Sequence, residues 1–204
     1  DHQVLRAGHD ALRREVHGLL GRPALAVDGG ARDVLGQAGR HDLVPTDQDN
    51  EQVRGGTPAR HLISVDGGPV LGGLYGTPAL HRFIAQQVGM GVRPLGVQAT
   101  YSMYSGAGAG LGLHRDVAGC DLALIACLQD NDPLDGGGCT EAWPKDLTTP
   151  LDELRQGRGG ASVTLGLAPG QCLLLHGGLV PHRIRATRAG RQRVVALMCF
   201  EAVP

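Results

Sequence analysis

Two side chains that commonly bind metals, His114 and Asp116, are separated by one position in the stretch LGLHRDVAGC. Residues two apart on a β-strand point to the same side of a sheet, so an imidazole and a carboxylate at this spacing can reach one point in space. A third ligand candidate is His182, in the later stretch CLLLHGGLVPHRIRATRAGRQRVVALMCF. The three residues predict a metal site with two imidazoles and one carboxylate.

This ligand set leaves coordination positions open on the metal, the arrangement that non-haem Fe(II) oxygenases use. Such an enzyme needs a two-electron reductant, which a 2-oxo acid dicarboxylate that chelates the metal can supply. The far carboxylate of that molecule requires a bidentate cationic partner. Arg193 is the first candidate, because it starts the last strand and alternates with Val195 and Leu197. Arg191 is the alternative, since a shift of one residue in the preceding turn would exchange the two arginines.

The elements that must position these residues change character near residue 94. Before it, apolar residues at helical spacing predict one helix within residues 1–20 and another from Pro78 to the residue before Gly89, with Thr77 as its cap. Residues 29–60 are polar and aperiodic, which is typical of a long loop. After it come five short β-type runs: GVQATYSMY, LALIACL, ASVTLGL, QCLLLH and RVVALMCF.

These runs predict a mainly β fold with flanking helices, a double-stranded β-helix or jelly roll with the N-terminal helices packed on one sheet. We expect one domain over residues 1–204, with helical support and loops in 1–93 and the jelly-roll core in 94–204. Loops that choose a substrate are expected at 29–60, 66–76 and 130–160.

Composition excludes several classes of protein. The formal net charge of -1 argues against a protein that mainly grips phosphate backbones, so no nucleic-acid partner is expected. No apolar run is long enough to span a bilayer, and no signal segment opens the chain, so we expect no membrane and a cytoplasmic location. Five cysteines stand mostly in apolar runs, which favours buried reduced thiols over a disulfide framework.

Four ordered segments resemble the Fe(II)/2-oxoglutarate-dependent dioxygenases, in particular their prolyl-4-hydroxylase-like branch. YSMYSGAGAGLGLHRD resembles the family's tyrosine, glycine turn and His-x-Asp, and LALIACLQDNDPLDGGGCTEAWP its strand, acidic turn and Gly-Gly-x-Thr-x-aromatic segment. APGQCLLLHGGLVPH is similar to the turn and strand before the distal histidine, and GRQRVVALMCF to the strand that holds the oxo acid. The resemblance covers residues 95–201, about half of the chain.

The resemblance implies that His114, Asp116 and His182 bind Fe(II) and that Arg193 holds the cosubstrate 2-oxoglutarate. Tyr104 would hydrogen-bond the cosubstrate. With O2, such an enzyme hydroxylates or otherwise oxidises an unactivated C–H of a small molecule, amino acid or peptide side chain, and converts 2-oxoglutarate to succinate. The chain departs from relatives that have a second tyrosine on the strand after His-x-Asp, because Ala126 and Cys127 stand there.

Two other functions remain open on the residues alone. A cupin-type jelly-roll binding module would use the pocket without redox chemistry, and a metal-dependent isomerase or hydrolase would use zinc or manganese. We expect His176 to pack rather than to bind the metal. Residues expected near the pocket mouth, where a substrate would enter, are Glu141, Trp143, Arg115 and Arg185. The sequence decides neither the substrate, nor hydroxylation against desaturation or cyclisation, nor the oligomeric state.

Overall fold

A computed structural model describes residues 58–95, 99–132 and 137–203 of the chain. The helix predicted within residues 1–20 and nearly all of the predicted loop at 29–60 lie outside these residues. The strands are β1 (Arg60–His61), β2 (Ile63–Asp66), β3 (Gly91–Pro94), β4 (Thr100–Ser105), β5 (Gly110–His114), β6 (Leu122–Asp130), β7 (Thr140–Ala142), β8 (Val163–Leu165), β9 (Cys172–Leu175), β10 (His182–Ile184) and β11 (Gln192–Val203). The helices are α3 (Gly68–Tyr75), α4 (Pro78–Val88) and α5 (Leu151–Arg155).

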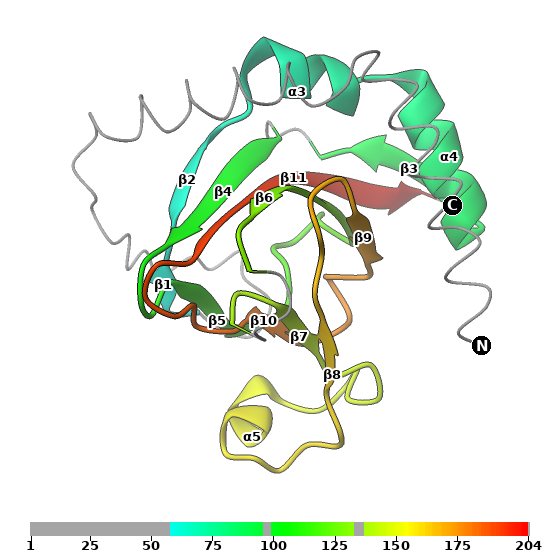
Figure 1. Ribbon diagram of the computed structural model, residues 1–204. Coiled ribbons are helices and arrows are strands. Elements are labelled where there is room, and N and C mark those ends of the chain that lie inside the picture. The colour runs from blue at the N-terminus through cyan, green and yellow to red at the C-terminus, as the bar shows by residue number, and fades with distance from the viewer. Residues whose placement is uncertain (1–57, 96–98, 133–136, 204) are drawn as a thin grey trace.

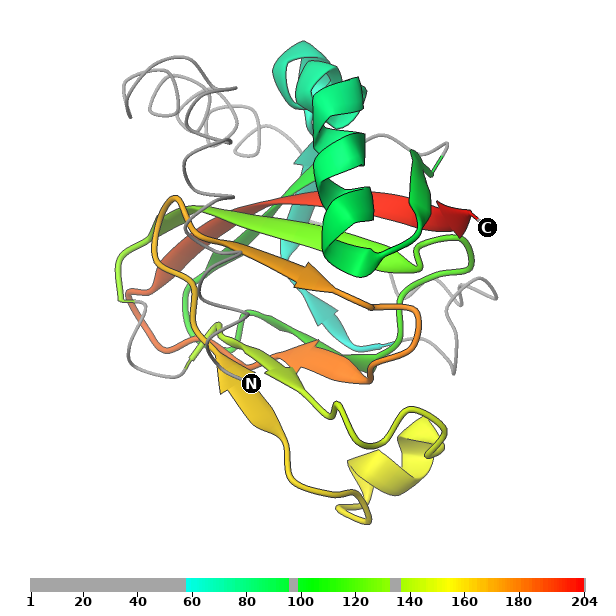
Figure 2. The same ribbon diagram turned by 90° about the vertical axis from the view of Figure 1, so that its right-hand side faces the viewer.

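Within the described residues the strands form two antiparallel sheets that face each other (Figure 1). The first sheet has the order β1-β5-β10-β7-β8. The second has the order β2-β4-β11-β6-β9, and β3 pairs with the far end of β11. Helices α3 and α4 cover the outer face of the second sheet, as both views show (Figures 1 and 2). The predicted jelly roll with helices on one sheet is therefore confirmed.

Strand β11 divides the apolar core into two layers because its side chains alternate between the two faces of the second sheet. Val195 faces the space between the sheets, where it packs in one cluster with Tyr104 and Cys127. Met198 and Phe200 face the other way and pack in a second cluster beneath the helices. Phe200 has no exposed surface, and burying a side chain of this size contributes about 2–3 kcal/mol to stability. The interior between the sheets is thus separated by a whole sheet from the helical layer.

Helix α4 has the bounds that its sequence predicts. Pro78 occupies its first turn, and Gly89 ends it in a left-handed conformation with φ of 71°, which glycine adopts without steric cost. Thr77 stands at the cap position, but its hydroxyl donates to the carbonyl of Gly73 instead of capping the helix.

The segment before residue 94 contributes more to the sheets than its sequence predicts. Strand β2 pairs with β4, β1 with β5 and β3 with β11, although the prediction places only helices and loops there. Helix α3 replaces the loop predicted at 66–76. Short strands of two to four residues are held by pairing with longer neighbours, which local sequence does not reveal. That residues 1–204 form one domain stays a prediction.

The prediction of reduced cysteines is wrong for one pair. Cys120 and Cys199 form a disulfide between positions 79 apart in sequence, with Cα atoms 5.0 Å apart. The pairing of β6 with β11, which places Leu122 opposite Phe200, brings these distant positions together. Cys127, Cys139 and Cys172 take no part in this disulfide. The described helices are all too short or too polar to cross a bilayer.

Candidate metal centre

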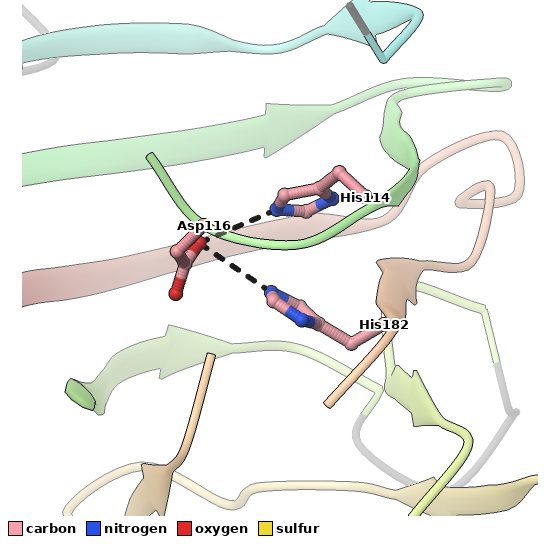
Figure 3. A group of neighbouring side chains, drawn as sticks. All are labelled: His114, Asp116 and His182. Atoms are coloured by element: carbon pink, nitrogen blue, oxygen red, sulfur yellow. Dashed lines mark ion pairs between the residues drawn. The ribbon is translucent and has the colours of Figure 1, made fainter. Parts of the chain in front are cut away.

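Three side chains converge between the two sheets, on the inner face of the first sheet (Figure 3). His114 is the last residue of β5 and His182 the first of β10, and the two are paired in register, so both rings lie side by side with centroids 4.2 Å apart. Asp116 lies beyond the end of β5, in the loop that follows. The alternation expected from a continuous strand therefore does not place Asp116. Its amide instead donates to the carbonyl of Gly177, 2.8 Å away.

The distances between the ligand atoms fit one small cation. Oδ1 of Asp116 lies 3.5 Å from Nε2 of His114 and 3.6 Å from Nε2 of His182. Two atoms that are each about 2.1 Å from one ion lie roughly 3.0–3.6 Å apart at coordination angles of 90–120°. One potential ligand atom from each of the three residues lies within 4.8 Å of the others. In addition, Oδ2 of Asp116 is buried and has no hydrogen-bond partner in the described part of the chain.

Backbone carbonyls orient both imidazoles. Nδ1 of His114 lies 2.8 Å from the carbonyl oxygen of Gly112, and Nδ1 of His182 lies 2.9 Å from that of Val180. A carbonyl oxygen can only accept, so each Nδ1 carries the proton and each Nε2 presents a lone pair. This outer hydrogen bond is the usual way in which a protein sets the tautomer of a metal-binding histidine.

Burial and charge favour the protonation states that metal ligands need. Burial lowers the pKa of His114, and the neighbouring ring of His182 lowers it further, which favours the neutral form of His114. Burial on its own raises the pKa of Asp116, but the adjacent imidazoles of His114 and His182 outweigh it and hold the pKa well below its usual range. The cluster thus combines a neutral imidazole with an ionised carboxylate, which matches the requirement for metal binding.

Arg115 anchors the loop that carries Asp116. Its Nε donates to the carbonyl of Leu179 at 2.9 Å, and its Nη2 lies within 3.0 Å of three further carbonyl oxygens. These carbonyls belong to Asp146, Leu147 and Thr149. The guanidinium of Arg115, expected near the pocket mouth, therefore holds together the loops that contain Leu179 and Asp146.

Arg193 and Arg191 both point inward from the start of β11, yet their surroundings differ. Arg193 is 1% exposed, and its Nη1 and Nη2 have no hydrogen-bond partner among the described residues. Arg191 donates from Nη2 to Oδ2 of Asp130 at 2.8 Å. The guanidinium of Arg193 lies 5.5 Å from the ring centre of Tyr104, its partner across β4. Burial raises the pKa of Tyr104, which keeps the phenol protonated.

Sequence reasoning missed Asp130, Gly177 and the role of Thr140. Thr140 is fully buried, lies on the same inner face of the first sheet as His182, and has a hydroxyl without a partner in the described residues. The acidic turn after β6 was a visible signal for Asp130, but nothing local marks its partners. The role of Gly177 comes from its contact with Asp116, which lies 61 positions earlier in the sequence, so local sequence does not reveal it.

The other predicted mouth residues lie on the outside of the first sheet. Glu141 pairs with Arg183 at 2.7 Å, and Trp143 packs against the cluster that includes Leu151. Arg185 lines an outer groove of about 710 Å³. Glu141 faces outward because side chains alternate along a strand and its neighbours Thr140 and Ala142 face inward. His176 is exposed and outside the metal cluster, so the expectation that it packs is wrong.

Comparison with known proteins gives matches at the level of structure. No protein-family model and no curated protein sequence matches the chain. A prolyl-4-hydroxylase from Pseudomonas putida aligns with a TM-score of 0.54 and 18% identity, over 90% of this chain and 89% of that one. AviO1 from Streptomyces viridochromogenes Tue57 aligns with a TM-score of 0.62 and 20% identity, over 90% and 88%.

EctD from S. alaskensis, in a structure with 2-oxoglutarate and 5-hydroxyectoine, aligns with a TM-score of 0.59 and 17% identity, over 88% of this chain and 68% of that one. At identities this low, the TM-scores show a shared fold and no more. The chain thus has the jelly-roll fold of prolyl-4-hydroxylase-like and other 2-oxoglutarate- and iron-dependent oxygenases, with a His-Asp-His cluster inside it.

Proposed function

We propose that the protein is an Fe(II)- and 2-oxoglutarate-dependent oxygenase that hydroxylates, or otherwise oxidises, an unactivated C–H bond of a small molecule, amino acid or peptide side chain. The observation that carries this proposal is the placement of two unsatisfied sites in one interior. The His-Asp-His cluster and the unpartnered guanidinium end of Arg193 both face the space between the sheets.

The buried polar atoms fit the two absent groups. A divalent cation would be bound by Nε2 of His114, Nε2 of His182 and the carboxylate of Asp116, the ligand set suited to non-haem iron. Nη1 and Nη2 of Arg193 form a planar fork that matches the far carboxylate of an oxo acid. Without an anion the two terminal nitrogens would remain buried donors with no hydrogen-bond partner in the described residues, which is costly.

Each protein group has a defined part in this proposal. The carbonyls of Gly112 and Val180 keep both imidazoles in the metal-binding tautomer. Tyr104 stays protonated and available as a hydrogen-bond donor next to Arg193. Iron and the oxo acid, when bound, would supply the oxygen activation that the side chains lack, with 2-oxoglutarate converted to succinate and carbon dioxide. Three protein ligands would leave coordination positions of a bound metal open.

The proposal extends to the class of substrate, a small molecule or a single side chain. EctD was crystallised with 5-hydroxyectoine, a small molecule, and has the same fold as this chain. The metal cluster lies between the two sheets, so the group that reacts there would be a small molecule or a single side chain. Of the segments expected to choose the substrate, 66–76 contains helix α3, and 130–160 contains strand β7 and helix α5.

An anaerobic titration tests the function without knowledge of the substrate. Adding Fe(II) and then 2-oxoglutarate to the wild-type protein is expected to produce the weak visible charge-transfer band of the chelated metal. Asp116→Ala should abolish the band by removing a metal ligand, and Arg193→Ala should raise the 2-oxoglutarate concentration needed to form it. Absence of the band in the wild-type protein would contradict the proposal.

A succinate-release screen separates the oxygenase from the two alternatives. Amino acids, short peptides and small heterocycles are incubated with protein, Fe(II), 2-oxoglutarate and O2, and succinate is measured. A cupin-type binding module would release no succinate, and its ligand binding would not change in the Arg193→Ala variant. A metal-dependent isomerase would turn over with zinc or manganese and without 2-oxoglutarate.

A further inference from the structure

Three charged side chains form a buried cluster where β11 begins. The side chains of Arg191, Arg193 and Asp130 are 2%, 1% and 1% exposed. Two guanidiniums face one carboxylate in this cluster. Buried polar groups that lack a partner are costly, because the interior solvates them poorly. In the described residues, Nη1 and Nη2 of Arg193 are such groups, and a carboxylate of a ligand could pair with them.

Asp130 is held in place by contacts on both of its oxygens. Oδ1 accepts a hydrogen bond from the amide of Asp132 at 3.1 Å. Oδ2 accepts one from Nη2 of Arg191 at 2.8 Å and lies 3.8 Å from Nε of Arg193. Since Arg193 and Asp130 are also opposite each other across β11 and β6, the carboxylate sits beside the Nε edge of the Arg193 guanidinium.

This placement leaves the two terminal nitrogens of Arg193, Nη1 and Nη2, available to a ligand. A carboxylate commonly engages arginine through both terminal nitrogens, which would consume the fork. Here Asp130 approaches only from the Nε side, Tyr104 lies over the guanidinium at 5.5 Å, and Nη1 and Nη2 remain without a partner in the described structure. Arg191 donates to Oδ2 of Asp130, and the two terminal nitrogens of Arg193 stay available for a ligand.

Gly138 allows the neighbouring loop to close over the same cluster. A Cβ atom at this position would lie 3.3 Å from Nε of Arg191 and 3.6 Å from Cδ of Arg193, and its φ of +67° suits glycine. The second glycine of the Gly-Gly-x-Thr segment thus packs directly on the two arginines.

We propose that Asp130, anchored by Arg191, is a positioning residue that aims the Arg193 fork at the far carboxylate of the 2-oxo acid. This inference rests on the proposed function. It assigns Arg191 a role different from the one considered in the sequence analysis: Arg191 holds Asp130 and does not itself bind the oxo acid. Asp130 acts through Arg193 and touches neither metal nor cosubstrate.

The substitution Asp130→Asn tests the inference, because electrostatic attraction and loss of positioning predict opposite changes in the affinity for 2-oxoglutarate. The substitution removes a negative charge near the site, so simple attraction would make the dianionic 2-oxoglutarate bind more tightly. Loss of positioning instead predicts weaker binding, by about tenfold or more, as is typical when an outer partner of a ligand-binding group is removed. Asp132→Asn is the matched control, since it makes the same charge change at an exposed position two residues away.

Binding is measured anaerobically by calorimetry and by the visible band, for 2-oxoglutarate and for pyruvate, with Fe(II) affinity measured separately. Asp130→Asn should weaken the binding of 2-oxoglutarate. It should leave the binding of Fe(II) unchanged, and also that of pyruvate, because pyruvate lacks the far carboxylate. The double variant Asp130→Asn with Arg191→Gln preserves the net charge of the wild type and should weaken 2-oxoglutarate as well. It provides the test if the single variant does not fold.

The possible failures are distinguishable. If the wild-type protein binds no 2-oxoglutarate, the proposed function is refuted and this inference with it. If the wild type binds it and both Asp130 variants bind it equally well or more tightly, only the positioning role is refuted. Equal weakening of pyruvate and 2-oxoglutarate would also overturn the inference, because it would show a general disturbance of the site.

Discussion

Replacing Gly177 by alanine should destroy the metal centre through a single methyl group. An ideal Cβ at position 177 would lie 1.7 Å from Oδ2 and 2.7 Å from Cγ of Asp116, whereas real Cβ contacts below 3.0 Å essentially do not occur. The carboxylate oxygen must therefore move by about 1.3 Å, far more than the roughly 0.2 Å that metal–ligand distances tolerate.

The backbone does not relieve this clash, because the amide of Asp116 is hydrogen-bonded to the carbonyl of Gly177 at 2.8 Å. Rotation of the Asp116 side chain is the available escape, and it turns the carboxylate away from His114 and His182. Gly177 is not among the positive-φ glycines, so alanine introduces no backbone strain there. We expect the affinity for Fe(II) to fall by at least about 100-fold, or about 2.8 kcal/mol.

Anaerobic calorimetry with Fe(II) measures the loss, and circular dichroism shows whether the fold persists. Gly73→Ala is the matched control: it also adds one methyl group, but nothing lies within 4 Å of its Cβ, and it should stabilise helix α3 by up to about 1 kcal/mol. A folded Gly177→Ala variant that binds Fe(II) as tightly as the wild type would refute the assignment of Asp116 as a ligand in this geometry.

Three further outcomes are expected. Arg115→Ala removes the hydrogen bonds to four backbone carbonyls and should lower the free energy of unfolding by about 3 kcal/mol, measured by urea denaturation; an unchanged midpoint would show that these contacts are not stabilising. Reduction of the Cys120–Cys199 disulfide by a dithiol should lower stability by about 4 kcal/mol, because the bond closes a long loop, and a melting temperature insensitive to reductant would contradict it. Arg193→Lys keeps the charge but loses the fork, so it should weaken 2-oxoglutarate about tenfold and leave Fe(II) binding intact; weaker Fe(II) binding would instead point to a disturbed metal cluster.

The sequence by itself determined the class of fold and the types of chemical group. Periodicity near 2 after residue 94 and the Pro78 and Gly89 signals that bound helix α4 are local properties, so the β-rich core and that helix could be predicted from short windows. His114, Asp116 and His182 were recognisable from residue type and order, and the alternation of Arg193 with Val195 placed it on the inner face of its strand.

Only the tertiary structure decided which groups meet and which are left open. Asp116 reaches the histidines through its backbone bond to Gly177, not through strand alternation, and Cys120 meets Cys199 only because β6 pairs with β11. The choice between Arg191 and Arg193 depends on where Asp130 lies. Contacts between residues tens of positions apart arise from sheet register, and a one-residue change of register reverses which side chains face the interior.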